Sequence, residues 1–224
     1  MTIPFVVHLM PPEESTLGTS RKNSSSAFDE RAVEIYERAA EIITQKGFDA
    51  TSMNDIAKAV DLTKAGLYYY IRSKKELLFA IMSFGMDAID RRVIEPVRSI
   101  DDPEVRLREI IVRHAAMLTE YSSAITIVFE EARSLSPAHR KKIVERNREY
   151  FAFIRETLQE LKDDGRLRDL DVGVAASNLF SIILGVVRWY RKGGRLKSED
   201  VVDEILKLAL NGLLTSPKPW NALT

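Results

Sequence analysis

Residues 51–76, TSMNDIAKAVDLTKAGLYYYIRSKKE, are the most informative stretch of this 224-residue chain. An amphipathic segment over residues 52–59 ends at Val60-Asp61-Leu62, and a second short helical segment begins at Thr63. The second segment combines small residues, three consecutive tyrosines and a basic end. Two short helices joined by a tight turn, the second with polar and basic side chains, are what a helix-turn-helix needs to enter the major groove of DNA. The stretch therefore predicts a DNA-binding protein.

The chain as a whole is electrically balanced, because it has 33 basic and 33 acidic residues and a formal net charge of zero. This balance excludes a globally basic DNA-binding protein, so any contact with DNA must come from a local basic patch. Such a patch exists over residues 62–75, which contain no acidic side chain and four cationic ones: Lys64, Arg72, Lys74 and Lys75.

Composition also limits the compartment and the chemistry. The chain has no cysteine, which excludes disulfides, thiolate zinc sites and cysteine nucleophiles. No apolar run reaches the roughly 18 to 20 residues of a membrane span. Residues 1–12 make a poor signal peptide, because they lack a basic start and prolines break a short apolar run. We therefore expect a cytoplasmic protein with no membrane partner.

Hydrophobic periodicity is helical almost throughout, and no segment makes a convincing strand. Gly47 and Gly165 are expected to end helices, and Asp102-Pro103 and Ser136-Pro137 to begin them. Thr51 or Ser52, then Thr63 and Ser73, are expected to cap the three helices that follow, and Pro96 to interrupt the third of these. The predicted fold class is all-α. The nine expected helices cover about residues 28–46, 52–59, 63–70, 73–94, 103–119, 121–134, 136–163, 171–190 and 198–214.

The last two helices suggest how the protein assembles. Residues 172–189 are apolar on nearly every side, which is typical of a helix that is deeply buried or shared with another subunit. The final helix adds a second apolar stripe, so two copies of the pair would form a four-helix dimer interface. We expect a homodimer through residues 171–214, since one short DNA-binding head gains affinity by dimerisation. A monomer with a central buried helix is the alternative.

Within the helix-turn-helix, Thr63, Lys64 and Tyr69 are expected on the outward face. Lys64 can reach a guanine edge or a phosphate, and the Tyr69 hydroxyl a phosphate or a thymine region. Lys74 starts the next helix, where the helix amino end and its ammonium together favour a phosphate. The pattern favours a core position for Tyr68 and leaves Tyr70 open. The full set of candidate DNA-binding residues is Thr51, Ser52, Thr63, Lys64, Ala65, Gly66, Tyr68, Tyr69, Tyr70 and Lys74.

Residues 28–84 resemble the DNA-binding domain of the TetR family of bacterial transcriptional regulators. The resemblance lies in Ala39-Ala40, Phe48, residues 51–57, Val60, Leu62-Thr63-Lys64, Leu67-Tyr68-Tyr69-Tyr70, Ser73-Lys74 and Glu76-Leu77-Leu78. The sequence departs from the family at Ala65, where glycine is commoner, and at Ile71, where an aromatic residue is commoner. These departures leave the fold expectation intact, but they make the base preference unreadable.

The resemblance implies nine or ten helices, a homodimer, and an N-terminal DNA-binding head on a C-terminal body that binds a small-molecule effector. It also implies that effector binding moves the fourth helix, changes the separation of the two heads and releases the operator. The expected regions are a disordered tail over residues 1–26, a DNA-binding domain over 27–74 with its helix-turn-helix at 52–71, a ligand-binding and dimerisation domain over 75–216, and a tail over 217–224.

A second, shorter resemblance concerns the effector. Residues 188–195, RWYRKGGR, are similar to a stretch in regulators of fatty-acid or steroid catabolism that sense acyl-CoA thioesters. The phosphates of coenzyme A could pair with Arg188, Arg191, Lys192 and Arg195. Trp189 could stack on its adenine, and the apolar helices could hold the acyl chain. The alternative is that the aromatic residues complete the dimer interface, while the basic ones complement the carboxyl end of a helix.

The competing ligand class is a cationic or aromatic drug, which would make the protein a repressor of an efflux gene. Glu130 and Glu131 beside Phe129, with Tyr121 nearby, would suit a buried cation. His114, close to Met117 in an apolar segment, is expected to be a core or pocket-wall residue. No grouping of metal ligands is apparent, and no cofactor is expected other than the effector itself.

Two further classes of protein were weighed against a regulator. A helical enzyme is disfavoured, because the sequence has no phosphate-binding loop, HExxH motif, nucleophile elbow or paired catalytic constellation. A purely structural helical dimer leaves the basic, acid-free segment over residues 63–75 unexplained.

Arg21 and Lys22 near the end of the N-terminal tail suit a minor-groove arm, although an unstructured leader without function is the alternative.

Overall fold

The computed structural model describes residues 22–120, 127 and 131–217, and within these residues the protein is all-α with no strand. The single β-type pairing is an isolated bridge between Leu167 and Leu214. The helices are α1 (Lys22–Lys46), α2 (Met53–Ala59), α3 (Lys64–Tyr70), α4 (Lys74–Ile89), α5 (Glu95–Val97), α6 (Pro103–Glu120), α8 (Pro137–Asp163), α9 (Val172–Trp189) and α10 (Ser198–Leu213). The all-α prediction is confirmed.

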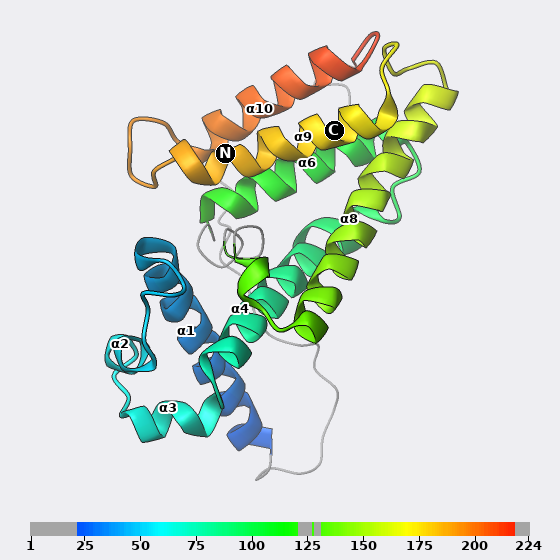
Figure 1. Cartoon of the computed structure of the whole chain (residues 1–224). Coiled ribbons are helices and arrows are strands. Elements are labelled where there is room, and N and C mark those ends of the chain that lie inside the picture. Colours follow the sequence, from blue (N-terminus) through cyan, green and yellow to red (C-terminus); the bar gives the residue numbers. More distant parts are fainter. Residues whose placement is uncertain (1–21, 121–126, 128–130, 218–224) are drawn as a thin grey trace.

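The helices divide into a small head and a larger body (Figure 1). Helices α1, α2 and α3 form the head around one end of α4, which then runs diagonally away from them. Helix α8 lies alongside α4 and continues to the far side of the body, where α6, α9 and α10 lie against one another. Because α4 contacts both α1 and α8, it is the rod that joins head and body.

The capping signals of the sequence are confirmed at the start of each helix around the turn. Ser52 caps α2 in a reciprocal capping box with Asp55, Thr63 caps α3, and Ser73 caps α4. Each hydroxyl accepts a backbone N–H that the first helical turn would otherwise leave unpaired. Gly47 ends α1 with a φ of +84°, a left-handed conformation that glycine adopts without steric cost.

The rod extends further than the sequence predicted. Its helical backbone continues past Ile94 to Val97, although Pro96 was expected to stop it. Proline has no N–H, so the Arg92 carbonyl four residues earlier loses its usual α-helical partner. The backbone adapts by widening into a π-helical turn over Asp90–Ile94, in which the Glu95 N–H donates to the Asp90 carbonyl. The chain thus passes Pro96 without a break between rod and body.

Two further helix predictions need correction or fall outside the described residues. Helix α1 begins at Lys22 rather than near residue 27 or 28, since no proline or glycine between Lys22 and Lys46 interrupts it. Of the helix expected over residues 121–134, the described part contains one helical residue, Ile127, and a short 3-10 turn over Ala132–Ser134. Of the tails expected over residues 1–26 and 217–224, residues 1–21 and 218–224 lie outside the described residues, whereas residues 22–26 belong to α1, contrary to the expectation of a disordered tail there.

Helix α9 is apolar on both its inner and its outer face. Val172, Ala175, Ala176, Leu179, Ile183 and Val186 are buried, whereas Val174 is 59% exposed and Ile182 36% exposed. The expectation that no apolar run reaches membrane-spanning length is corrected here: by length and composition α9, with a mean hydropathy of 1.6, is the one described helix that would suffice. It packs against α6, α8 and α10 in the helical body.

Candidate nucleic-acid interface

A small apolar core fixes the angle between α2 and α3. Ile56, Ala57 and Leu67 are at most 3% exposed, and they pack on buried residues of α1. Asp61 makes the turn between the helices with a φ of +52°, a conformation that aspartate tolerates better than most residues. Arg31 of α1 also donates a hydrogen bond to the Val60 carbonyl. The head therefore presents α3 on a rigid support.

The outer face of α3 is polar and open to solvent. Thr63, Lys64 and Ala65 are exposed, and Tyr69 is 76% exposed, as the sequence predicted. Tyr68 is 42% exposed, so the preference for a core position is wrong, and Tyr68 belongs with the surface set of candidates. Tyr70 is half-buried and meets Tyr69 edge to face, with ring centroids 5.4 Å apart.

Gly66 is explained by the helix cap. Its N–H donates to Thr63 Oγ1 over 3.0 Å, and a Cβ placed at Gly66 would lie only 3.3 Å from that same oxygen. A larger residue would press on the capping hydroxyl. The absence of a side chain therefore preserves the cap, and it also lets the backbone of α3 approach a partner closely.

Two residues expected to contact DNA are engaged within the head. Thr51 is 1% exposed, and its hydroxyl donates to the Gly47 carbonyl over 2.8 Å, so the expectation of a DNA contact through this side chain is wrong. Ser52 is exposed, but its hydroxyl is hydrogen-bonded to Asp55 in the cap of α2. These residues fix α2 against the end of α1.

Lys74 is placed at the first turn of α4, close to the end of α1. Its ammonium donates to the Asp49 carbonyl over 3.2 Å and lies 4.3 Å from the centre of the Phe48 ring. The cation thus ties the start of the rod to the turn after α1. Arg72 and Lys75, which belong to the same basic segment, are exposed to solvent. Neither has an ion pair within the described part of the chain.

The interior of the body contains a buried polar pair that the sequence only half revealed. His114 of α6 and Tyr150 of α8 share a hydrogen bond of 2.8 Å, and Phe180 of α9 packs edge-on against both rings. His114 and Met117 are buried, as expected. The second ring nitrogen of His114, Nε2, has no hydrogen-bond partner among the residues that the structure describes. A buried nitrogen without a partner lowers the stability of the fold. A hydrogen bond from a polar ligand atom would remove this penalty.

Burial holds the histidine neutral. It lowers the pKa of His114 from 6.5 to about 3, and it raises the pKa of Tyr150. The unfolded chain takes up a proton at His114 as the pH falls below about 6.5, whereas the folded protein does not do so until about pH 3. Stability contributed by the neutral ring is therefore present at high pH and lost as the pH falls through this window.

The variant His114→Gln is expected to lose much of this acid sensitivity. In the native protein, the unfolded state binds a proton at His114 below about pH 6.5 and the folded state does not. Over about 1.5 pH units this difference lowers the free energy of unfolding by about 2 kcal/mol between neutral pH and pH 5. Urea unfolding at the two pH values measures the difference, with His139→Gln as the matched control. An equal acid-induced loss of stability in His114→Gln and the native protein would contradict this assignment.

The remaining effector candidates do not converge on the buried pair. Arg188 and Trp189 are exposed at the carboxyl end of α9, where Trp189 is 52% exposed. Arg191 donates to the carbonyls of Arg188 and Tyr190 over 3.4 and 3.0 Å. This geometry favours the alternative in which the basic residues complement a helix end. Tyr121 and Phe129 lie outside the described residues.

The drug-binding alternative gains no support from the side chains that the structure describes. Glu131 accepts a hydrogen bond from Ser134 over 3.0 Å, and Glu130 lies outside the described residues. Within the described ranges, no cluster of three or more potential metal ligands occurs.

Two family models match most of the helical chain. Residues 35–81 match the family model of bacterial regulatory proteins of the tetR family, and residues 101–213 match that of the tetracyclin repressor-like C-terminal domain. The chain belongs to the TetR family. It is a DNA-binding transcriptional regulator, which agrees with the exposed polar face of α3.

Relatives of this TetR-family protein span nearly its whole described length. It is 27% identical over 185 residues to the HTH-type transcriptional repressor KstR2 of Mycobacterium tuberculosis, which covers 82% of this chain and 92% of the relative. The crystal structure of AibR in complex with isovaleryl coenzyme A and operator DNA superposes with a TM-score of 0.73 at 34% identity, covering 80% of this chain and 97% of AibR. The KstR2 structure gives a TM-score of 0.77 at 26% identity, over 83% and 96% of the two chains.

Besides the aromatic partners of His114, sequence reasoning missed two features of α8 in this TetR-family chain. Arg146 reaches across to α4, and Arg140 and Arg148 border a surface hollow. Their helix was recognised, but its long polar stretch gave no hint of which cations are paired. A count of opposite charges at helical spacing would have helped, since residues 137–148 contain only one acidic residue.

Proposed function

We propose that this protein is a transcriptional repressor that binds its operator as a homodimer and releases it when an acyl-CoA binds the body. The observation that carries the DNA half of the proposal is the exposed face of α3, held on a capped and rigid head. The likeness to AibR, crystallised with isovaleryl coenzyme A and operator DNA, supports the effector class. Such a regulator acts in the cytoplasm and performs no catalysis.

On DNA, α3 enters the major groove with Thr63, Lys64 and Tyr69 directed at base edges and nearby phosphates. Ala65 and Gly66 let the helix backbone come close. The remaining candidates, Ser52, Tyr68, Tyr70 and Lys74, are assigned to the sugar-phosphate backbone, where Ser52 and Lys74 would exchange their bonds to Asp55 and the Asp49 carbonyl for a phosphate. These contacts position the head without reading sequence.

Dimerisation uses the outer faces of α9 and α10. Val174 and Ile182 lie two helical turns apart on α9, and Leu208 of α10 is 65% exposed. Three large apolar side chains in water on neighbouring helices favour a second apolar surface. A second copy of the chain would supply it.

The acyl group of the effector is proposed to enter the body between α6, α8 and α9. Its apolar wall is made by Met117 and Phe180, and the unpaired Nε2 of His114 suits the polar thioester end. The control of lipid catabolism genes would follow from such a ligand. A thermal-shift series with acyl-CoAs of increasing chain length, and with the aromatic cation ethidium, separates the effector classes. Stabilisation by ethidium alone would replace this proposal with the drug-efflux alternative.

The effector signal is proposed to reach the head through contacts between α8 and α4. The His139 ring stacks on Phe79 with centroids 4.0 Å apart and an angle of 9° between planes. Arg146 forms ion pairs with Asp87, at 2.7 Å, and with Asp90, which opens the π-helical turn of the rod. A shift of α8 would therefore move α4, and with it the head.

The variant Arg146→Ala is expected to uncouple the two sites. Acyl-CoA should still bind, but the ratio of operator affinities without and with the ligand should fall by about three- to tenfold, because mutations along a coupling contact change the coupling by about 0.5–2 kcal/mol. Operator titrations with and without ligand measure this ratio. Arg113→Ala, which removes an ion pair within α6 alone, is the control. A normal ratio in Arg146→Ala would remove Arg146 from the coupling path.

A further inference from the structure

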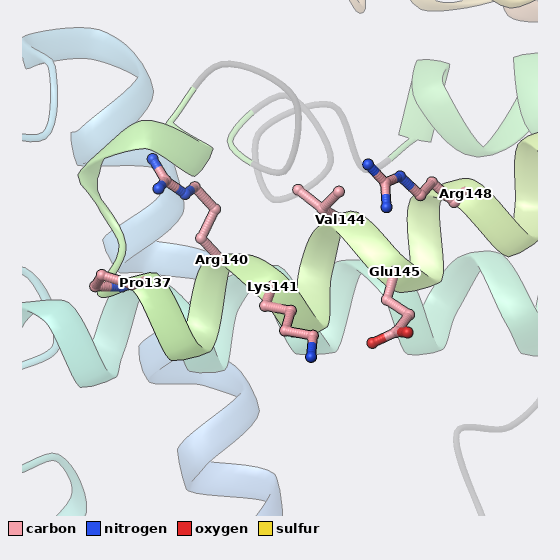
Figure 2. A pocket seen from close by; sticks show the side chains of 6 residues that line it. All are labelled: Pro137, Arg140, Lys141, Val144, Glu145 and Arg148. Carbon is pink, nitrogen blue, oxygen red and sulfur yellow. The ribbon is translucent and has the colours of Figure 1, made fainter.

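The outer side of α8 carries a basic hollow that the proposed function has not used. The hollow has a volume of about 280 Å³ and is lined by Pro137, Arg140, Lys141, Val144, Glu145 and Arg148. Figure 2 shows Arg140, Val144 and Arg148 in one row along the helix, with Lys141 and Glu145 in a neighbouring row. Three cations thus face one hollow, and Glu145 is the single acidic side chain among its described lining residues.

Among the described residues, these three cations share the absence of an ion-pair partner, whereas Arg146 of the same helix has two. Arg146 is paired with Asp87 and Asp90, and Lys142 lies 5.7 Å from the centre of the Phe79 ring. Within the described residues, neither Arg140, Lys141 nor Arg148 has an opposite charge within ion-pair distance. The amino end of the 27-residue helix, which starts at Pro137, adds its own positive potential. The hollow is therefore a place for an anion with several charges.

A second observation on the same helix points to a ligand. The side-chain carbonyl oxygen of Asn147, Oδ1, is buried and has no hydrogen-bond partner within the described part of the chain. Successive residues of an α-helix are rotated by about 100°, so Asn147 lies between the row of Arg140 and Val144 and the inward-facing Tyr150. A buried acceptor without a donor is costly unless a ligand N–H or a water completes it.

Between residues 140 and 150 of α8, the character of the polar groups changes from the surface towards the core. Cations come first, then the unpaired Asn147 acceptor, then the Tyr150–His114 pair with its unpaired Nε2. Coenzyme A has the same order of chemistry, with phosphates at one end, a pantetheine arm of secondary amides in the middle and the thioester at the other end. Phosphates favour arginine, whose planar group donates two hydrogen bonds at once.

We propose that α8 is the helix that binds the coenzyme A part of the effector. Arg140, Lys141 and Arg148 hold its phosphates, and Asn147 accepts a hydrogen bond from a pantetheine amide. This inference rests on the proposed acyl-CoA effector, and it replaces Arg188 and Arg191 as the phosphate site. In Figure 1 those residues belong to the end of α9 at the left of the body, away from the beginning of α8 beside α4.

The location also links ligand and rod. Residues 140, 144 and 148 lie on the side of α8 opposite His139, Lys142 and Arg146, which hold α4. An anion bound on the outer side therefore contacts the same turns of α8 whose other side holds α4. The nucleotide part of the ligand, and not only its acyl chain, takes part in the release of DNA.

Calorimetric titration of the full-length protein with decanoyl-CoA tests the site. The double variant Arg140→Ala, Arg148→Ala is expected to bind at least about tenfold more weakly and to lose most of the salt dependence between about 50 and 300 mM. Arg155→Ala, an exposed arginine of α8 outside the hollow, is the matched control and should bind normally. The double variant Arg140→Lys, Arg148→Lys should restore part of the affinity, because it keeps the charge.

Asn147→Leu gives an independent readout. It should weaken decanoyl-CoA binding by about three- to tenfold without changing the salt dependence, since an amide and not a charge is lost. Its thermal stability should equal or exceed that of the native protein, because a buried unpaired acceptor is removed. A loss of binding that merely followed a loss of stability would contradict a ligand contact at Asn147.

The outcomes separate this site from the proposed function. If the native protein binds no acyl-CoA from isovaleryl to palmitoyl, the proposed function fails and the site fails with it. If the native protein binds decanoyl-CoA and the Arg140→Ala, Arg148→Ala variant binds it equally well, the α8 site alone is overturned. Loss of binding in Arg188→Ala, Arg191→Ala with normal binding in the α8 variant would place the phosphates at the end of α9 instead.

Discussion

Replacing Lys64 and Tyr69 together by alanine is expected to weaken operator binding at least about a hundredfold. Each specific contact to a base is worth about 1–3 kcal/mol, and a dimer loses it in both heads. Both side chains are exposed and take no part in the core beneath α3, so the fold should be unchanged. Fluorescence anisotropy with labelled DNA from upstream of the gene measures the effect.

The control for this experiment is Arg155→Ala, which removes an exposed cation of the body and should bind DNA normally. Binding to unrelated DNA gives a second comparison. The double variant should lose more affinity for the operator than for unrelated DNA, because α3 supplies the base contacts. An equal loss on both DNAs would mean that Lys64 and Tyr69 contact only the backbone.

Introducing glutamate at Val174 and Ile182 is expected to produce a monomer and to reduce operator affinity at least about a hundredfold. The two residues lie on the exposed face of α9, where two negative charges would be desolvated without partners in a dimer. Light scattering after gel filtration distinguishes the 25.4 kDa chain from a particle of twice that mass. Operator binding then falls, because one head alone binds a single half-site.

Leu170→Glu is the matched control, since Leu170 is an apolar residue outside both α9 and α10 that is as exposed as Ile182, at 36%. It should remain a dimer and bind DNA normally. If the Val174→Glu, Ile182→Glu protein stays at twice the chain mass, the dimer interface does not lie on α9.

Much of the head was predictable because local rules decide it. The capping hydroxyls of Ser52, Thr63 and Ser73 act on the first turn of their own helices, and a short stretch of sequence contains everything they need. The left-handed Gly47 is equally local. These positions fixed the boundaries of α2, α3 and α4 before any three-dimensional arrangement was known.

What could not be predicted depends on contacts between distant segments. The sequence favours a DNA-facing position for Thr51 and a core position for Tyr68, but the packing of the head buries the first and leaves the second exposed. The passage of Pro96 through the rod depends on a π-helical turn that periodicity does not indicate. The pairing of Arg146 with α4, and the freedom of Arg140 on the same helix, depend on how α8 packs.

Some of the effector-binding candidates could be predicted from the sequence and others could not. His114 and Met117 were correctly expected in the interior, because an apolar helical face surrounds them. Tyr150 and Phe180 were missed, since an aromatic residue on an apolar face is usually core packing, and only the fold brings them to His114. Arg191 was weighed as a phosphate ligand, but its guanidinium serves the end of α9.

The central claim is that acyl-CoA releases a dimeric repressor from its operator, and one titration tests it most directly. Labelled DNA from upstream of the gene is bound by the native protein, and decanoyl-CoA, free coenzyme A and decanoate are added in turn while anisotropy is followed. The account predicts sequence-specific binding that decanoyl-CoA reverses, with at least about a tenfold loss of affinity, and that neither half of the ligand reverses alone. Operator affinity that is unchanged by acyl-CoAs of every chain length would contradict it.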